Sequence, residues 1–130
     1  MVKASSPGVR TLLNSLNQGG LVTIASDQVP NQESGVISDF FKVPALSMSL
    51  VVKLAAKTNC PCHSVSCVRR KGGKGYKIYF SELINISQNL DTQVGVNLMN
   101  SELEKCIMRA PEQYAWEYKR FKKSLFKSPY

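Results

Sequence analysis

The residues best suited to metal chemistry lie in one short stretch that contains Cys60, Cys62, His63 and Cys67. Thiolates and imidazoles are the usual ligands of structural zinc. We interpret residues 60–69 as a buried strand, however, and the side chains of a strand alternate between its two faces. Cys60 and Cys62 then face away from His63 and Cys67, and the spacing matches no common zinc pattern. We therefore expect buried, reduced structural thiols and no metal site.

His63 is the only histidine in the chain, so a catalytic site of the Ser-His-acid or Cys-His type would have to use it. No acidic residue lies near it in the sequence. We expect a packed, hydrogen-bonded histidine and assign no catalytic residue.

The Gly-rich stretch 72–75 has a superficial likeness to a phosphate-binding loop. Such a loop leads into a helix, whereas Tyr76 begins a predicted strand, so a hairpin turn is the better interpretation. Five basic residues near this turn form a local positive patch, for which a solvated face and contact with an anion are equally open: Arg69, Arg70, Lys71, Lys74 and Lys77.

Asp27 and Gln28 directly follow residues 21–26, a short run rich in β-branched residues. Such a run is typical of a strand buried on both faces of a parallel sheet. Because ligands bind at the carboxyl edge of open α/β sheets, Asp27 and Gln28 are candidate site residues; a simple polar cap on the strand is the alternative.

The elements that would position these residues follow from capping and periodicity. A helix is predicted from Ser6–Pro7 to about Leu16, ended by the glycines at 19 and 20. After a loop at 29–35, residues 40–45 lead into a helix from about Ser47 to Thr58, with Asn59 at its end. The inner side of this helix should carry Val51, Leu54 and Ala55, and Lys53 and Lys57 should face water.

The second half should contain a hairpin and two helices. Strand 60–69 pairs with an alternating, half-exposed strand that begins at Tyr76. Asp91 can cap a helix that reaches Ala110. Pro111 then opens a terminal helix, followed by a basic tail within 111–130. The inner face of the Asp91 helix should carry Val96, Met99, Leu103, Cys106 and Ile107, and the terminal helix should carry an aromatic stripe of Tyr114, Tyr118 and Phe121.

The predicted fold class is α/β, with few strands flanked by helices. A strand buried on both faces needs neighbours on either side, and only two further strands are predicted. The sheet is therefore short of partners, which indicates part of a larger α/β domain or a chain that needs another subunit.

Composition and charge narrow the class of protein. A chain of 130 residues with 43% hydrophobic content suits one globular domain. It has no apolar run near the ~20 residues that span a membrane, and no signal-peptide pattern at its start. The net charge is +8, of which +6 lies in residues 69–130. This excess favours anionic partners: phosphates, acidic proteins, nucleic acid or an anionic membrane surface.

Several stretches together resemble the lipid A biosynthesis late acyltransferases, the lauroyl and myristoyl transferases that act on Kdo-lipid IVA. Residues 111–122 resemble the family signature Pro-Glu-Gln-Tyr-x-Trp-x-His-Arg-Arg-Phe-Lys. Other matches come in family order: Gly8-Val9-Arg10, the Asp27-Gln28 pair, Phe40-Phe41-x-x-Pro44-Ala45-x-Ser47, and Arg69 with Gly75-Tyr76. Lys42 stands where the family has Gly, Asp39 near where it has Pro, and Tyr118 where it has His.

The resemblance implies a glycerolipid-acyltransferase-like three-layer α/β domain, of which residues 1–130 are the C-terminal part. It implies acyl transfer from acyl carrier protein to a hydroxyl of a lipid A precursor, without a cofactor, at the cytoplasmic face of the bacterial inner membrane. It also implies substrate contacts at Asp27, Gln28, Arg69 and Arg120.

The family's catalytic His-x-x-x-x-Asp/Glu dyad lies upstream of every matched block. His63 is followed five residues later by Val68, so we expect this chain to be inactive alone and to work with a separate N-terminal half. The alternative function is a small basic protein that binds nucleic acid or an anionic membrane; under the family interpretation nucleic acid is not an expected partner.

Overall fold

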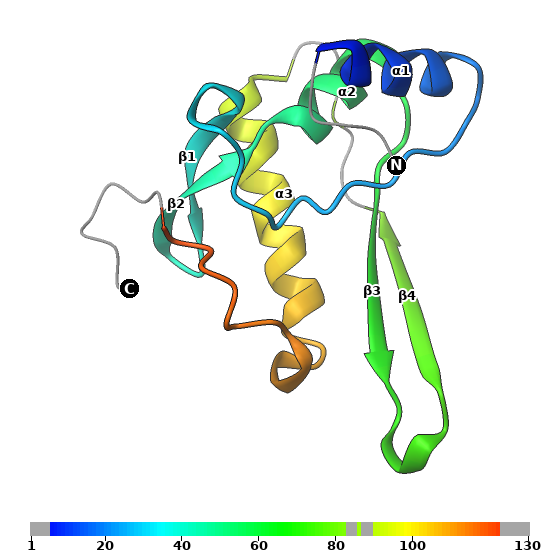
Figure 1. Cartoon of the computed structure of the whole chain (residues 1–130), viewed down its shortest axis with the longest axis vertical. Coiled ribbons are helices and arrows are strands. Elements are labelled where there is room, and N and C mark those ends of the chain that lie inside the picture. Colours follow the sequence, from blue (N-terminus) through cyan, green and yellow to red (C-terminus); the bar gives the residue numbers. More distant parts are fainter. Residues whose placement is uncertain (1–5, 83–85, 87–89, 123–130) are drawn as a thin grey trace.

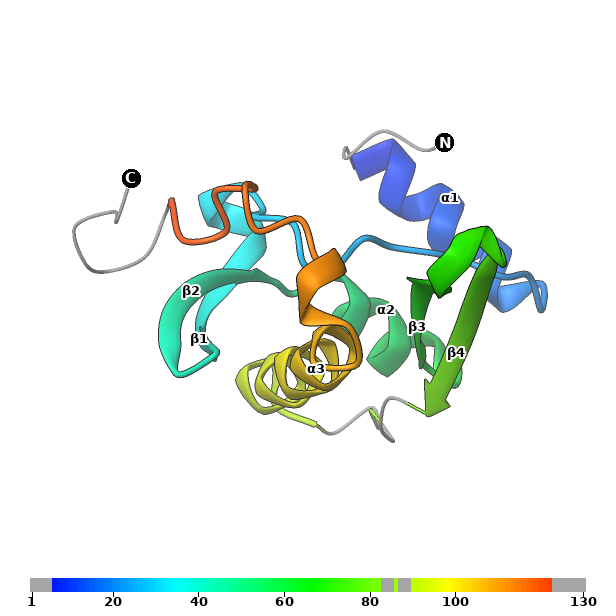
Figure 2. The same cartoon turned by 90° about the horizontal axis from the view of Figure 1, so that it is seen from below.

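The computed structural model describes residues 6–82, 86 and 90–122. Its helices are α1 (Ser6–Asn17), α2 (Leu50–Thr58) and α3 (Thr92–Ile107). The strands β1 (Gly35–Phe40) and β2 (Val43–Met48) form one antiparallel hairpin, and β3 (His63–Arg69) and β4 (Tyr76–Glu82) form another. In Figures 1 and 2, α3 lies between the two hairpins, and Figure 2 shows α2 between α3 and α1. The α/β class is confirmed, as a partial α/β domain.

The central helix α3 begins where the sequence predicts. The Asp91 side chain accepts hydrogen bonds from the backbone N–H groups of Gln93 and Val94, at 2.8 and 3.2 Å. This cap satisfies two of the free N–H groups of the first turn. The helix ends at Ile107, three residues before the predicted end, and its inner face buries Val96 and Met99 as predicted.

Two apolar clusters involve the buried face of α3, and Leu103 packs against both. One contains Val52, Ala55, Ile86, Val96 and Met99, and the other contains Phe40, Ala45 and Ile107. In α2, Lys53 and Lys57 are exposed and the helix ends at Thr58, as predicted. The inner face of α2 contains Val52, which is 1% exposed, in addition to the predicted Leu54 and Ala55.

The β1–β2 hairpin is absent from the predictions. Residues 40–45 were expected to lead into a helix from about Ser47, whereas Ser47 lies in β2 and the helix begins at Leu50. The hairpin turn consists of Phe41 and Lys42, both with positive φ, at 51° and 62°. Such turns normally carry Gly or Asn, so the local sequence hides this one. The Phe41 N–H donates to Glu104 Oε1 at 2.7 Å, which ties the turn to α3.

Residues 21–26 do not form the predicted buried strand. Residues 21–25 belong to neither sheet, a turn begins at Ser26, and Leu21 is 88% exposed. Its composition suits a sheet interior, but a strand exists only where neighbours complete its hydrogen bonds. The described part of the chain does not provide those neighbours.

The predicted pairing of β3 with β4 is confirmed, whereas the predicted burial of β3 is wrong. The strands pair in the register His63↔Glu82 to Arg69↔Tyr76, around a turn in which three glycines have positive φ. Residues 60–62 lie before the strand, and the strand itself is mostly exposed. Its apolar face is open, with Val65 54%, Ile78 58% and Phe80 72% exposed.

The terminal segment from Pro111 is also not an α-helix within the described residues. Pro111–Gln113 forms a short 3-10 turn, and residues 114–122 follow in irregular turns. The aromatic stripe at helical spacing is therefore wrong. The predicted basic tail beyond 122 lies outside the described residues. No helix among the described residues is long and apolar enough to cross a bilayer.

Gly95 lets α3 approach α2 closely. A Cβ atom at this position would lie 2.5 Å from Val52 Cγ1 and 3.2 Å from Cγ2. Val52 is β-branched and fully buried, so it has little freedom to move aside. The absence of a side chain at Gly95 is therefore a packing requirement.

We predict that Gly95→Ala lowers the free energy of unfolding by about 2 kcal/mol. Alanine gains about 1 kcal/mol in helix propensity, but overpacking against a rigid neighbour costs about 3 kcal/mol. Urea unfolding followed by circular dichroism measures the change. The double variant Gly95→Ala/Val52→Ala should be more stable than the sum of the single losses, because the smaller residue removes the clash. Strict additivity would contradict this account.

Candidate functional site

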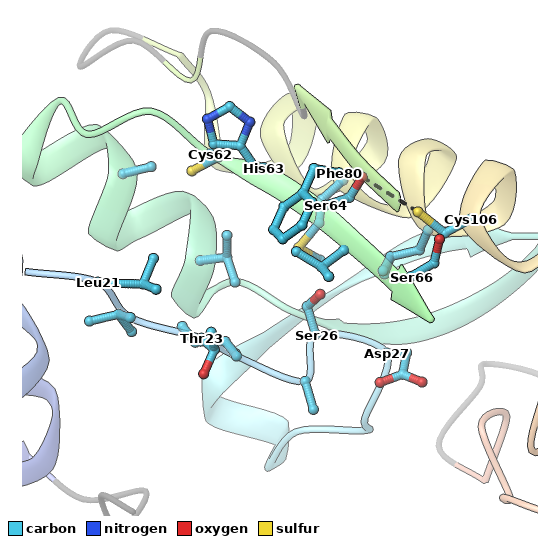
Figure 3. A pocket seen from close by; sticks show the side chains of 18 of the residues that line it. Leu21, Thr23, Ser26, Asp27, Cys62, His63, Ser64, Ser66, Phe80 and Cys106 are labelled. Carbon is cyan, nitrogen blue, oxygen red and sulfur yellow. Dashed lines mark hydrogen bonds between the residues drawn. The ribbon is translucent and has the colours of Figure 1, made fainter. Parts of the chain in front are cut away.

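An apolar trough of about 920 Å³ runs between residues 21–27 and the β3–β4 hairpin. Figure 3 shows Leu21 from residues 21–27 and Phe80 from β4 on opposite sides of it. Residues of α2 and of the C-terminal half of α3 also line the trough, and Asp27, Gln113 and Tyr114 lie at one end. Asp27, Gln113 and Tyr114 therefore form a polar group that could recognise a substrate in a mostly apolar channel.

Asp27 is held in place by the terminal segment. Tyr114 donates its hydroxyl hydrogen to Asp27 Oδ2 at 3.2 Å, and the Val29 N–H donates to the Tyr118 hydroxyl at 2.9 Å. Two tyrosines of the terminal segment thus fix the loop that carries Asp27 and Gln28. Asp27 is half-buried, whereas Gln28 is exposed.

The surroundings of Tyr114 favour its neutral form. Burial, together with the charge and the hydrogen bond of the nearby Asp27 carboxylate, raises the pKa of Tyr114 to about 12, and burial is the largest of these causes. Tyr114 therefore stays a hydrogen-bond donor to Asp27 at neutral pH.

Arg120 lies beneath this corner and is only 3% exposed. Its Nη1 donates to the Leu46 carbonyl and its Nη2 to Ser47 Oγ, each at 2.8 Å, and its guanidinium lies 4.8 Å from the centre of the Phe40 ring. Burial lowers the pKa of Arg120, and the electrostatic interactions with Tyr114, Asp27 and Tyr118 oppose that shift. Arg120 thus anchors the terminal segment to β2 and places a positive charge behind Asp27.

Gln113 fixes the end of β3. Its Oε1 accepts from the Arg69 N–H at 2.8 Å, and its Nε2 donates to the Arg69 carbonyl at 3.2 Å. The side-chain amide thereby imitates a neighbouring strand. Since Tyr114 is the next residue, two adjacent side chains join Arg69 and Asp27, which are 42 positions apart. The Arg69 side chain is exposed.

The cysteines differ from the expectation. All four are free, but Cys67 is exposed and the other three are only half-buried. Burial raises the pKa of Cys62 to about 11, with a further contribution from Cys60. Cys106 Sγ donates to Ser64 Oγ at 3.4 Å. No group of three or more His, Cys, Asp or Glu residues that could hold a metal ion occurs among the described residues.

His63, predicted to be packed, is exposed at the start of β3. The expectation assumed that β3 lies inside a sheet. Because β3 pairs with β4 alone, one face of the hairpin remains uncovered and His63 is open to solvent.

The basic residues 69–71, 74 and 77 are all exposed on the β3–β4 hairpin. Lys77 Nζ lies 4.8 Å from the centre of the Tyr79 ring, and the Arg109 guanidinium lies 4.9 Å from the same ring. Arg109 also donates to Ser81 Oγ at 3.1 Å. The predicted patch is therefore a real surface feature, extended by a cation from just beyond α3.

The family model of the bacterial lipid A biosynthesis acyltransferases matches residues 1–123. The chain belongs to this family. It is 30% identical over 115 residues to the lipid A biosynthesis lauroyltransferase of Escherichia coli K12, and 29% identical over the same length to the palmitoleoyltransferase of that organism. A lipid A biosynthesis acyltransferase of Shigella flexneri is also 29% identical.

The match covers 88% of this chain and 37–38% of the relatives. Membership gives the terminal signature a structural meaning, because Gln113, Tyr114 and Arg120 each hold a different earlier segment. Arg120 was among the expected site residues, whereas Gln113 and Tyr114 were not. Their place between Pro111 and Trp116 in the signature was the available signal.

The departure at Lys42 also has an explanation. The family's Gly at this position suits a turn residue with positive φ, and Lys42 has φ 62°. This chain therefore keeps the turn with a residue that is strained there, and the Phe41–Glu104 hydrogen bond helps to hold it.

We predict that Asp27→Asn lowers the pKa of Tyr114 below about 12 but leaves it above 10, because burial is the larger cause and remains. Absorbance at 295 nm follows the titration, and the difference from Tyr114→Phe isolates this residue. Since folding raises this pKa, the associated stability is present below pH 10 and is lost as the pH rises towards 12. An unchanged Tyr114 titration in Asp27→Asn would contradict the contact.

Proposed function

We propose that this chain forms the acceptor-binding part of a lipid A biosynthesis acyltransferase. In the reaction, a fatty acyl chain passes from acyl carrier protein to a hydroxyl of a lipid A precursor. The observation that carries the proposal is the joint hold of Gln113 and Tyr114, adjacent in the family signature, on Arg69 and Asp27. Two expected site residues thus meet the same short segment, at the polar end of an apolar trough.

The residues at this end suit a phosphorylated sugar lipid. The Asp27 carboxylate accepts hydrogen bonds from hydroxyl groups, and the Gln28 amide both donates and accepts. The exposed Arg69 guanidinium can pair with a phosphate through two parallel hydrogen bonds. The Nη atoms of Arg120 donate to Leu46 and Ser47, so Arg120 holds the terminal segment in place and does not bind substrate directly.

The chemical step needs a base as well as this acceptor site. The base takes the proton of the acceptor hydroxyl, the oxygen attacks the thioester carbonyl, and the carrier thiolate leaves. The family resemblance assigns this role to a His-x-x-x-x-Asp/Glu dyad. The sole histidine, His63, has Val68 at the fifth position after it. We therefore propose that residues 1–130 do not transfer acyl groups by themselves, and that the base belongs to a part of the family's chain that this sequence does not match.

A chimera tests the proposal. The matched region of the E. coli lauroyltransferase is replaced by this chain, and transfer from acyl-acyl carrier protein to a lipid A precursor is measured. We expect transfer by the chimera and none by residues 1–130 alone. Asp27→Asn should lower kcat/KM at least tenfold, because a hydrogen bond to a charged group contributes about 1.5–3 kcal/mol.

The matched control for charge is Lys53→Gln, on the exposed side of α2, which should leave kcat/KM unchanged. A folded chimera without transfer would overturn the proposed function. Equal effects of Asp27→Asn and Lys53→Gln would contradict a role of Asp27 in the site. Acyl transfer by the free chain would contradict the proposal that the base lies outside residues 1–130.

We further propose that the chain is peripheral at the cytoplasmic face of the bacterial inner membrane, and that the β3–β4 turn contacts anionic lipid. Arg70, Lys71 and Lys74 are exposed there without an acidic residue between Arg69 and Lys77. The turn projects away from α3 in Figure 1, so it can reach a flat surface. Binding to an anionic membrane, which the basic residues also suggest, would then be part of the family function.

We predict that Arg70→Glu/Lys74→Glu weakens sedimentation with phosphatidylglycerol vesicles at least thirtyfold, because each basic residue near an anionic surface contributes about 1 kcal/mol. The control Lys53→Glu/Lys57→Glu changes the net charge equally on the exposed side of α2. Equal weakening by both variants would show that the total charge, and not the turn, decides binding.

A further inference from the structure

One edge of β3 has free backbone groups that face away from β4. Gln113 occupies the N–H and C=O of Arg69, so these two groups point away from β4. In an antiparallel pair, successive residues alternate between pointing towards and away from the partner strand. The backbone groups of Val65 and Cys67 therefore point away from β4 as well, and no partner for them lies in the described part of the chain.

Residues 21–26 also lack hydrogen-bond partners for their backbone groups within the described part of the chain. Their backbone makes no hydrogen bond to any described residue, although their neighbours Gly20 and Val29 both do. Extended backbone without partners is a template for pairing with another strand. Both segments line the same trough, so two sets of unpaired peptide groups border one space.

The side chains around this space are apolar and open. Leu21 is 88% exposed, Phe80 72% and Val65 54%, and all three line the trough. Figure 3 shows Leu21 and Phe80 on its two walls. A contiguous exposed apolar surface of this kind marks a place where something binds.

The occupant must satisfy peptide groups as well as cover apolar side chains. A hydrocarbon chain could cover Leu21 and Phe80, but it has no donors or acceptors for the backbone of Val65 or of residues 21–26. An extended polypeptide provides both, through its own backbone and alternate side chains. The relatives contain a large amount of such polypeptide, because this chain matches only 37–38% of their length.

We propose that the trough accepts a β-strand from the part of the family's chain that this sequence does not match. The strand pairs with residues 21–26 or with the Val65–Cys67 edge of β3 and covers Leu21 and Phe80. The inference rests on the family assignment used for the proposed function, but it concerns folding and not acyl transfer. It makes the trough a seam within a larger sheet and leaves the Asp27 end for substrate.

Hydrogen–deuterium exchange tests the strand directly in the lauroyltransferase chimera and in the free chain. In the free chain, amides of residues 21–26 and of Val65 and Cys67 should exchange rapidly. In the chimera, amides that the new strand engages should exchange at least a hundredfold more slowly. Unchanged exchange of both segments in the chimera would overturn the proposal.

Paired variants test the side chains. Leu21→Ser/Phe80→Ser should leave the Tm of the free chain nearly unchanged, because both residues are exposed there. It should lower the Tm of the chimera by about 4 °C or more, because both residues become buried. The matched control Val94→Ser/Met108→Ser alters residues that are 45% and 61% exposed outside the trough, and it should affect both proteins little.

Two further outcomes would overturn the proposal. A concentration-dependent dimer of the free chain that protects residues 21–26 would assign the trough to a second copy. Binding of dodecanoate by the chimera at Leu21 and Phe80, with the amides still exchanging rapidly, would assign it to a hydrocarbon. Protected amides in a chimera that transfers no acyl group would support the strand and count only against the proposed function.

Discussion

The hydroxyl of Ser47 joins three segments that are far apart in the sequence. Ser47 Oγ accepts a hydrogen bond from Asn100 Nδ2 at 2.9 Å and another from Arg120 Nη2 at 2.8 Å, and it donates to the Ala45 carbonyl at 3.2 Å. One donor and two acceptors are all that a hydroxyl has, so its capacity is filled. Ser47 and Asn100 are fully buried. An unpaired buried polar group costs about 1–3 kcal/mol, so loss of this hydroxyl would weaken the contact between β2, α3 and the terminal segment.

The position of Asp27 depends on this junction. Arg120 is fixed by Leu46 and Ser47, and its charge lies close enough to Asp27 and Tyr114 to influence the pKa of Tyr114. The same terminal segment holds Asp27 through Tyr114 and the end of β3 through Gln113. The signature segment thus holds Asp27 and the end of β3 together beside the trough. Because a buried charge is costly, Arg120 depends on its hydrogen bonds to Leu46 and Ser47 and on its contact with the Phe40 ring.

Partial burial explains the main disagreements between sequence and structure. Segment 21–26 and β3 carry the composition of sheet interior, yet Leu21 and Val65 are open to solvent. The strand that we propose for the trough accounts for this composition without a different fold. The residues are suited to a sheet that the described part of the chain does not complete.

The sequence alone determined the features that local chemistry controls. Capping by Asp91 fixed the start of α3, the left-handed Asn59 ended α2, and alternation with a glycine turn produced the β3–β4 hairpin. The family could also be inferred from the sequence, because its signature is contiguous in the chain.

Only the tertiary structure decided what that signature does. The spacing of its aromatic residues favours a helix, but hydrogen bonds of Gln113, Tyr114 and Arg120 to three distant segments outweigh a weak helical propensity. The turn at Phe41 and Lys42 was hidden for the same reason, since Glu104 stabilises a backbone that these residues do not favour. Local sequence cannot encode such contacts, because each partner lies more than 40 residues away.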